Sequence, residues 1–182
     1  GELYDANYDK SLIDERNHCK SLCYQFNNTA YEDIEKRYEI LKSILGSTKE
    51  NFTIEPSFWC DYGYNIELGE NFYSNHNLVI LDCTKVTFGD NVFIAPNCGF
   101  YTAGHPLDVT QRNQGLEYAK PIKVGNNVWF GANVTVLPGV TIGDNCTIGA
   151  GSVVVKDIPD NSLAIGNCLL YTSPSPRDYA AS

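Results

Sequence analysis

Methionine is absent from all 182 residues of the chain, position 1 included. Because translation starts with methionine, we expect the natural start of the protein to lie upstream of Gly1. The chain also lacks any apolar run near the roughly 20 residues that a membrane-spanning helix needs, and no signal peptide opens it. These absences argue against a membrane partner and predict a cytoplasmic protein.

Positive charge is scarce. Lysine and arginine number 13 against 22 aspartate and glutamate residues, which gives a formal net charge of −9. Proteins that bind nucleic acid usually present a basic face, so we expect no nucleic-acid partner. A small anionic ligand remains compatible with this charge, because a few local cations and backbone N–H groups can hold it. Hydrophobic residues make up 43% of the chain, as in an ordinary globular protein.

The seven cysteines show no metal-ligand spacing. Cys19 and Cys23 are the close pair, at helical spacing, and no second pair accompanies them. We therefore expect free, buried thiols in a reducing compartment. Histidine is also rare: of only three, His18 lies in a segment predicted to be helical. A zinc site built from three histidines is not expected, and we predict no metal.

Residues 1–55 have the pattern of a helical cap. A first helix is predicted from about Lys10 to Tyr24. Residues 29–32 read Thr-Ala-Tyr-Glu, the form of a capping box, and apolar residues follow at helical spacing until Gly46. The capping box predicts that a second helix opens there and ends at Gly46.

A six-residue repeat dominates residues 56–166. In its clearest block each hexad begins with an apolar residue, usually has glycine second and has a small or β-branched residue fifth. An apolar residue every six positions, followed by turn residues, indicates a short strand and a tight corner. Because one rung cannot bury its own apolar face, the rungs must stack. The fold class is therefore mainly β: a parallel β-helix of triangular section, three hexads per turn, with a short helical cap. The clearest hexads are VGNNVW, FGANVT, VLPGVT, IGDNCT and IGAGSV (124–153).

The repeat is interrupted twice. Its phase is imperfect between 74 and 87, and it is broken from about 104 to 121, where polar and turn residues predict a projecting loop of the kind that often carries function. Residues 167–182 show no repeat, and LLYTSPSPRD resembles translated non-coding sequence. We expect a non-native or disordered tail that neither extends the β-helix nor docks on it; the alternative is a divergent flexible tail.

Several segments match those of a known group of enzymes: GELYDANY (1–8), NFYSNHNLVILD (71–82), VTFGDNVFIAPN (86–97), YTAGHP (101–106) and the repeats of 122–159. Together they resemble the maltose and galactoside O-acetyltransferases over roughly residues 1–166. The hexads alone would indicate only the wider superfamily; the opening, the Asn75 segment and TAGHP indicate this branch. The resemblance implies a left-handed β-helix, acetyl-CoA as co-substrate and a homotrimer with active sites between neighbouring subunits. The chain departs from the family after Gly166, where relatives continue with proline and a basic segment that helps bind the phosphates of CoA.

By this resemblance His105 is the general base. A lone histidine is more often structural, but His105 lies at the mouth of the predicted loop between Gly104 and Pro106. A sugar hydroxyl is a poor nucleophile, and neutral imidazole can accept its proton during attack on a thioester. Glu117 is a candidate to orient His105 or the acceptor; the alternative is a solvated carboxylate in the loop.

The resemblance also implies contacts to both substrates. Asp5, Asp61 and Asn75 match positions that bind the sugar, and their side chains suit hydroxyl groups; turn or cap chemistry is the alternative for each. Cys83 stands where some relatives have an aspartate that touches the sugar, which leaves the identity of the acceptor open. For acetyl-CoA, small residues would let the pantetheine arm lie against the rungs, and a lysine could meet a phosphate. The matching positions are Trp129, Gly131, Ala132, Ala150 and Lys156.

The expected activity is O-acetyl transfer from acetyl-CoA to a hydroxyl of a sugar such as maltose, glucose or a galactoside. Two alternatives stay open. The acceptor could be an antibiotic, an amino sugar or a serine, or the chain could be a non-catalytic β-helix scaffold. A scaffold has no need of the TAGHP segment beside a break in the repeat, so His105 favours an enzyme.

Overall fold

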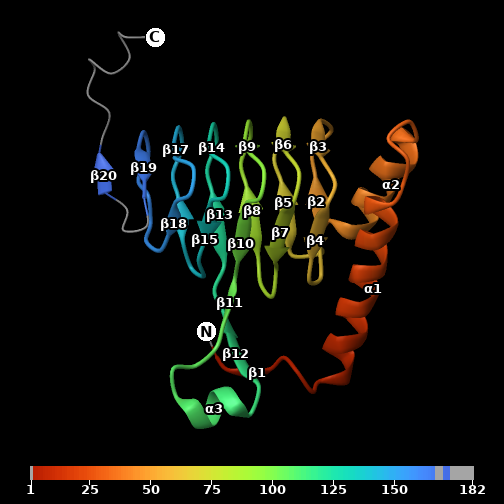
Figure 1. The fold of residues 1–182 in the computed structure, drawn as a ribbon, viewed down its shortest axis with the longest axis vertical. Helices are drawn as coiled ribbons and strands as arrows, with labels where there is room; N and C mark the ends of the chain where they lie inside the picture. The colour runs from red at the N-terminus through yellow and green to blue at the C-terminus, as the bar shows by residue number, and fades with distance from the viewer. Residues whose placement is uncertain (1, 167–169, 173–182) are drawn as a thin grey trace.

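Short parallel strands stack into a three-sided prism, and two helices cover one end (Figure 1). The computed structural model describes residues 2–166 and 170–172. The expected fold class, a left-handed parallel β-helix with an N-terminal helical cap, is confirmed.

We name the three sides of the prism by the side chains that they turn outward. The polar face comprises β2 (Ser47–Thr48), β5 (Ile66–Leu68), β8 (Val86–Phe88), β13 (Ile122–Val124) and β16 (Thr141–Ile142). The aliphatic face comprises β4 (Phe58–Cys60), β7 (Leu78–Leu81), β10 (Gly99–Tyr101), β15 (Thr135–Val136) and β18 (Val153–Val154). The aromatic face comprises β3 (Phe52–Ile54), β6 (Phe72–Ser74), β9 (Phe93–Ile94), β14 (Trp129–Phe130), β17 (Thr147–Ile148) and β19 (Leu163–Ile165).

The length of each turn explains both interruptions of the repeat. Lys123 pairs with Thr141, 18 residues later, which is three hexads. Upstream, Val79 pairs with Gly99, 20 residues later, so each early coil holds two extra residues and the phase slips. Gly99 then pairs with Thr135, 36 residues later. The excess over 18 is another 18 residues, the length of the loop predicted at 104–121.

Asparagine forms most of the corners. Eight asparagines of the described chain have positive φ, between 55° and 65°, a conformation that asparagine tolerates better than most side chains. Five of these amides stack from coil to coil, each Nδ2 donating to the next Oδ1 at 2.9–3.2 Å. This ladder supplies the side-chain amides with partners along one edge of the prism. Its members are Asn71, Asn91, Asn127, Asn145 and Asn161.

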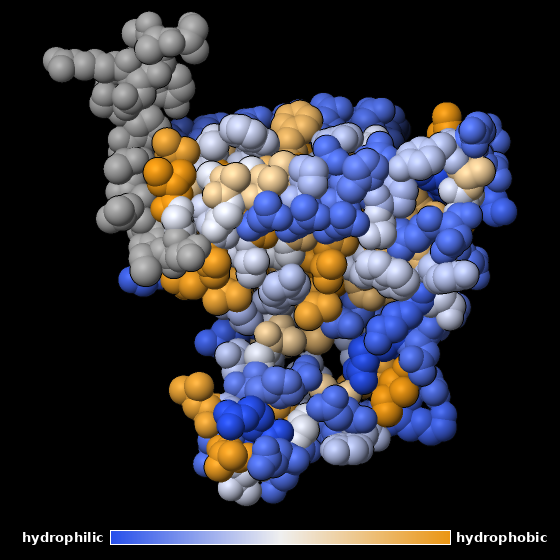
Figure 2. Space-filling view, viewed as in Figure 1, coloured by the Kyte–Doolittle hydropathy of each residue, from blue (hydrophilic) through white to orange (hydrophobic). Residues whose placement is uncertain are grey.

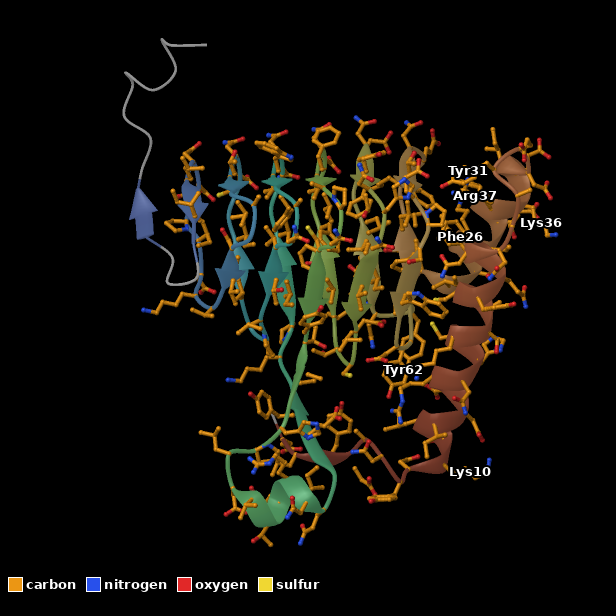
Figure 3. The ribbon with its side chains drawn as sticks, in the orientation of Figure 1. Lys10, Phe26, Tyr31, Lys36, Arg37 and Tyr62 are labelled. Atoms are coloured by element: carbon orange, nitrogen blue, oxygen red, sulfur yellow. The ribbon has the colours of Figure 1, made fainter. Side chains whose placement is uncertain are left out.

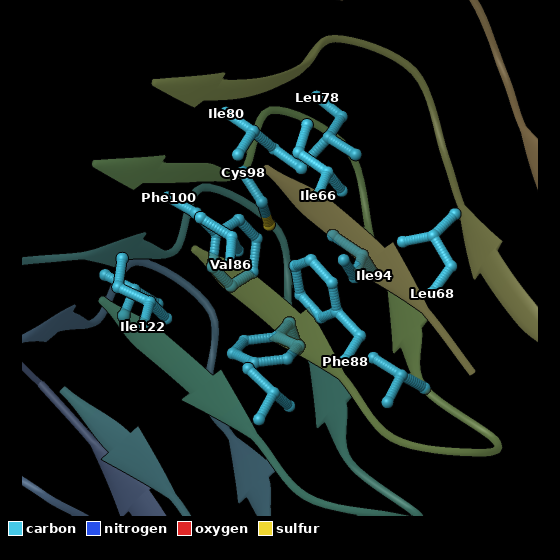
Figure 4. Close-up of a cluster of buried hydrophobic side chains, with 14 of the residues drawn as sticks. Ile66, Leu68, Leu78, Ile80, Val86, Phe88, Ile94, Cys98, Phe100 and Ile122 are labelled. Atoms are coloured by element: carbon cyan, nitrogen blue, oxygen red, sulfur yellow. The ribbon is translucent and has the colours of Figure 1, made fainter. Parts of the chain in front are cut away.

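The first residue of each hexad points into the prism and is buried, which gives a continuous apolar core (Figure 4). Phe72, Phe88, Phe100 and Phe130 stack through it edge to face, with ring centroids 5.0–5.1 Å apart. Edge-to-face aromatic pairs contribute about 0.5–1.5 kcal/mol each beyond their buried area. The core therefore ties successive coils together along the whole axis.

The cap consists of α1 (Lys10–Asn27) and α2 (Ile34–Ile44). Asp9 caps α1, its side chain accepting from the N–H groups of Ser11 and Leu12. The predicted capping box is wrong. The Thr29 hydroxyl donates to the Gln25 carbonyl at 2.7 Å, so this residue closes α1 instead of opening α2. None of the helices described is both long and apolar enough to cross a bilayer.

The segment predicted as a loop carries structure of its own and projects below the prism (Figure 1). It contains β11 (Ala103–Gly104), α3 (Val109–Asn113) and β12 (Leu116–Ala119). β12 pairs antiparallel with β11 on one side and with β1 (Tyr4–Asp5) on the other. The N-terminal arm is thereby fixed to the loop.

At the far end of the prism, β20 (Leu170–Thr172) pairs antiparallel with β19. The prediction that the tail adds nothing to the β-helix is wrong for these three residues. The last parallel strand of a stack has unpaired backbone groups along its edge, and these can pair with any chain that reaches them. Residues 167–169 and 173–182, on which the rest of the prediction about the tail falls, lie outside the described residues.

Candidate active site

His105 directly follows β11, where the chain leaves the prism for the projecting loop. The backbone approach here is close. A Cβ built on Gly104 would lie 2.5 Å from both Cζ and the hydroxyl oxygen of Tyr118, the cross-strand partner on β12. A side chain at position 104 would therefore force the Tyr118 ring to shift, and the pairing of β11 with β12 sets the position of His105.

The hydrogen bonds of His105 fix its tautomer. Nδ1 lies 3.0 Å from the carbonyl oxygen of Leu116. A carbonyl can only accept, so Nδ1 carries the proton and Nε2 keeps its lone pair. Nε2 lies 3.7 Å from Oε1 of Glu117, and the imidazole is about half exposed, at 48%, whereas Glu117 is 17% exposed. The arrangement offers a free basic nitrogen toward solvent, with a carboxylate placed to stabilise the imidazolium.

Glu117 is held in turn by the N-terminal arm. Tyr4 is its cross-strand partner, and the Tyr4 hydroxyl donates to Glu117 Oε2 at 3.2 Å. Burial raises the pKa of Tyr4, so the hydroxyl stays a donor. One carboxylate oxygen is thus occupied by Tyr4, and the other faces His105.

A small polar pocket of about 120 Å³ opens beside this pair, between the N-terminal arm, α1, the edge of the prism and the loop. Figure 2 shows the surface hollowed between the prism and the projecting segment. The lining places carboxylates opposite cations, an arrangement that can both donate hydrogen bonds to hydroxyl groups and accept from them. The lining residues are Ala6, Asn7, Arg16, Lys20, Asp61, Cys83 and Glu117.

Asp61, one of the candidate sugar ligands, follows β4 and lines the pocket. Burial raises the pKa of its carboxyl, and the Cys83 thiol donates to Asp61 Oδ2 at 3.6 Å. The loop that holds Asp61 is fixed by Asp82, whose Oδ1 accepts from the N–H groups of Asp61 and Tyr62 at 3.0 and 2.9 Å. Asp82 is fully buried, and burial raises its pKa to about 6.

The structure does not bring the other two candidate sugar ligands into this pocket. Oδ1 of Asp5 accepts from the N–H groups of Asn7 and Tyr8 and shapes the turn before α1. Asn75 follows β6, at the corner between the aromatic and aliphatic faces, and its Oδ1 accepts from the N–H of His76 at 2.7 Å. Within a single chain, both side chains therefore stabilise turns, which was the alternative to a contact with the sugar.

The sequence did not indicate four residues that lie in the pocket or contact its lining: Tyr4, Asn7, Arg16 and Lys20. Arg16 donates to the Ala6 carbonyl at 2.6 Å and to the Tyr62 hydroxyl at 2.7 Å, so α1 holds both the arm and the prism; Figure 3 shows Tyr62 beside this helix. The four-residue spacing of Arg16 and Lys20, which puts both on one helix face, was the available signal.

The candidate acetyl-CoA residues gather along two stacked coils. Trp129 pairs with Thr147, which aligns Gly131 and Ala132 with the residues just before Gly151. The Gly151 N–H donates to the Ala132 carbonyl at 2.8 Å. A Cβ on Gly131 would lie 2.5 Å from the Ala150 nitrogen, so glycine lets the two corners touch. Trp129 is exposed, and Lys156 lies apart, after β18.

The candidate residues occupy two different edges of the prism. His105, Asp61 and Glu117 lie where the aliphatic face turns toward the polar face. Asn75, Gly131, Ala132 and Ala150 lie where the aromatic face turns into the aliphatic face. We call these two groups of candidate residues the two half-sites, and we name them the histidine edge and the glycine edge.

Two family models match the chain: the maltose acetyltransferase hexapeptide capping motif over residues 1–49 and the bacterial transferase hexapeptide of six repeats over residues 121–156. The chain is 47% identical over 179 residues to the galactoside O-acetyltransferase of Escherichia coli K12, covering 98% of this chain and 88% of that protein. A solved maltose O-acetyltransferase from Clostridium difficile 630 superposes with a TM-score of 0.92 at 50% identity, covering 95% and 92% of the two chains. A galactoside acetyltransferase in complex with coenzyme A gives 0.94 at 43% identity, covering 98% and 90%.

Proposed function

The chain belongs to the maltose and galactoside O-acetyltransferase family, and from this premise we propose how its own residues perform the reaction. It transfers an acetyl group from acetyl-CoA to a sugar hydroxyl. The observation that carries our proposal is the hydrogen bond from His105 Nδ1 to the Leu116 carbonyl, which leaves Nε2 as the base.

In the proposed step His105 Nε2 accepts the hydroxyl proton while the sugar oxygen attacks the thioester carbonyl carbon. The C–S bond then breaks, and the imidazolium returns the proton to the departing CoA sulfur. Glu117, 3.7 Å from Nε2, stabilises the imidazolium between these two transfers. The Tyr4 hydroxyl keeps Glu117 in that orientation.

We propose that the polar pocket holds the acceptor. Asp61 and the cations Arg16 and Lys20 suit the vicinal hydroxyls of a sugar ring, and Cys83 makes one wall less polar than an aspartate would. Asn75 of a neighbouring subunit would complete the ring of hydrogen bonds. Asp5 acts indirectly, by shaping the arm that carries Ala6 and Asn7.

For acetyl-CoA we propose the glycine edge. Gly131, Ala132 and Ala150 leave room for the narrow pantetheine arm and expose backbone groups to its amides, and Trp129 offers an exposed apolar ring beside them. Lys156 lies at an edge shared with His105 and would meet a phosphate. Gly131, Ala132 and Ala150 are too small to block this path, and Trp129 lies at its border.

We propose that the chain forms a homotrimer, and the separation of the two half-sites supports this. Cyclic assembly uses two different patches of each subunit, and the prism offers two apolar ones. Phe93 and Trp129 are paired in register and are 48% and 54% exposed on the aromatic face, and Trp59 is exposed on the aliphatic face. The polar face instead carries an ion pair, Lys85 with Glu67. We propose that the aromatic face of one subunit meets the aliphatic face of the next, which joins a histidine edge to a glycine edge.

We also propose the cytoplasm as the compartment. Six cysteines of the described chain are free, and free thiols persist where the environment is reducing.

The acceptor class is tested with a panel of maltose, glucose, galactosides, amino sugars, serine and aminoglycoside antibiotics, with CoA release measured by a thiol reagent. The proposal expects release with the neutral sugars, and acetyl ester in the product. Release only with amine acceptors, giving an amide, would replace the proposed acceptor by one of the alternatives.

A further inference from the structure

Three cysteine sulfurs meet where α1 packs on the first coil of the prism. Cys19 and Cys23 lie one helical turn apart on α1, and Cys60 ends β4. The Cys60 Sγ lies 3.4 Å from that of Cys19 and 3.7 Å from that of Cys23, and all three Sγ atoms lie within 4.8 Å of one another. The expectation of free, buried thiols is confirmed for these three residues. Cys60 comes from a distant strand, so no local spacing in the sequence indicated it as a third ligand.

The sulfur spacing suits one central atom with three sulfur ligands. A metal–thiolate bond is about 2.3 Å long, which puts the sulfurs of a flat trigonal site about 4 Å apart and those of a pyramidal site closer together. Within the described residues no histidine or carboxylate joins the three sulfurs as a fourth ligand. A structural zinc site, which takes four protein ligands, is therefore a poor match.

Charge selects the kind of ion. The three thiols lie in the hydrophobic core with Phe26, Phe58 and Ile44, and no lysine or arginine of the described chain donates a hydrogen bond to them. Three thiolates around a monovalent ion would carry two negative charges, and around a divalent ion one. A net charge in such surroundings is costly. Three thiolates around a trivalent centre form a neutral unit.

We propose that Cys19, Cys23 and Cys60 form a binding site for trivalent arsenic or its chemical analogue antimony. Arsenite, As(OH)₃, exchanges its three hydroxyl groups for the three sulfurs. Three S–H bonds and three As–O bonds break, three As–S bonds and three water molecules form, and no atom is oxidised or reduced. The bound centre joins α1 to β4 and so fastens the helical cap to the prism.

A route to the thiols exists. A cavity of about 160 Å³ opens between α1, α2 and the first coil, and Cys19 is part of its wall together with His18, Leu22, Ile44 and Tyr64. Its volume accommodates a molecule of the size of arsenite, which is only a few times larger than water. The ligand therefore needs no unfolding of the cap to reach Cys19.

The test uses the full-length, fully reduced protein and sodium arsenite, with intact-mass spectrometry, thiol counting under denaturing conditions and thermal unfolding as readouts. We expect one arsenic per chain, the loss of three titratable thiols and a higher melting temperature, because a ligand that binds only the folded state stabilises it. Potassium antimonyl tartrate should compete for the same site, and zinc should not.

Cys60→Ser and Cys23→Ser should each lose the addition, whereas Cys98→Ser and Cys146→Ser remove buried thiols elsewhere in the prism and should keep it. Acetyl transfer and melting temperature without arsenite report whether each variant is folded. Because Cys60→Ser could weaken the cap, wild-type protein blocked by antimony gives a second test that needs no substitution. The proposal is wrong if folded wild type takes up no arsenic, if Cys60→Ser retains it, or if three thiols are not consumed.

Discussion

Tyr4 and Glu117 are partners across the β1–β12 ladder, and the Tyr4 hydroxyl donates to Glu117 Oε2 at 3.2 Å. This pair links the first residues of the chain to the carboxylate that faces His105. Tyr4 of the N-terminal arm is thus part of the proposed catalytic arrangement, although it lies more than a hundred residues from His105 in the sequence.

Glu117→Gln should lower kcat by roughly ten- to a hundredfold, because the imidazolium loses its carboxylate while the side-chain shape is kept. Tyr4→Phe should lower kcat less than Glu117→Gln, since the carboxylate keeps its charge and loses only one hydrogen bond. Steady-state kinetics with a neutral sugar measure both. Equal rates for wild type and Glu117→Gln would remove Glu117 from the mechanism.

Gly104→Ala should reduce activity while leaving the prism folded. The added Cβ would lie 2.5 Å from Tyr118 Cζ, so the Tyr118 ring must shift, and we expect β11 and His105 to be displaced with it. Replacing the obstructing ring tests this cause: Gly104→Ala combined with Tyr118→Ala should regain activity toward the level of Tyr118→Ala alone. If the double variant is no better than Gly104→Ala, the contact with Tyr118 is not what requires glycine.

Asp82→Asn should stabilise the protein at neutral pH. Burial raises the pKa of Asp82 to about 6 in the folded state, above the unfolded value of about 3.9. Its contribution is therefore fully present below about pH 3.9 and is lost as pH rises through about 6. Asparagine keeps the oxygen that accepts from Asp61 and Tyr62 but carries no charge.

Denaturant unfolding at pH 4.5 and pH 7.5, at one protein concentration, measures this difference. Relative to wild type, Asp82→Asn should gain about 2 kcal/mol between the two pH values. A free-energy difference that is the same at both values would show that Asp82 does not titrate in this range.

Ala150→Trp should block the proposed pantetheine path and raise the KM for acetyl-CoA, whereas Ala30→Trp, at an exposed site between the helices, should not. The two half-sites permit a sharper test. Ala150→Trp retains an intact histidine edge, and His105→Ala retains an intact glycine edge. When the two are unfolded and refolded together, about a quarter of the interfaces in a cyclic trimer should join two intact edges.

Mixed refolding should therefore restore activity that neither variant shows alone. Each variant refolded separately is the control, and light scattering follows the trimer. Recovery of trimer without any recovery of activity would mean that each chain completes its own site.

The sequence predicted the prism well because the six-residue repeat follows the burial of side chains. The first residue of every hexad in 124–153 is buried, and asparagine or glycine lies at the corners of the prism. The capping box at Thr29 was predicted wrongly because residues 29–32 match its pattern. Only the tertiary structure decides whether the Thr29 hydroxyl bonds to the helix that follows it or, as here, to the helix that precedes it. The pocket was predicted in part. Asp61 and Glu117 could be inferred from the resemblance, whereas Tyr4 and Asn7 contact partners far away in the sequence, and no local pattern contains such pairings.

The central claim is that His105 is the general base, and the most direct measurement compares His105→Ala with wild type and with His18→Ala, which removes an exposed histidine of α1. We predict that His105→Ala lowers kcat on a neutral sugar by roughly 10²–10⁴-fold, the usual size of a general-base contribution. Its affinity for acetyl-CoA, measured by calorimetry, should stay within a few-fold of wild type, and His18→Ala should keep full activity. A His105→Ala protein that turns over sugar at a rate near that of wild type would contradict the account.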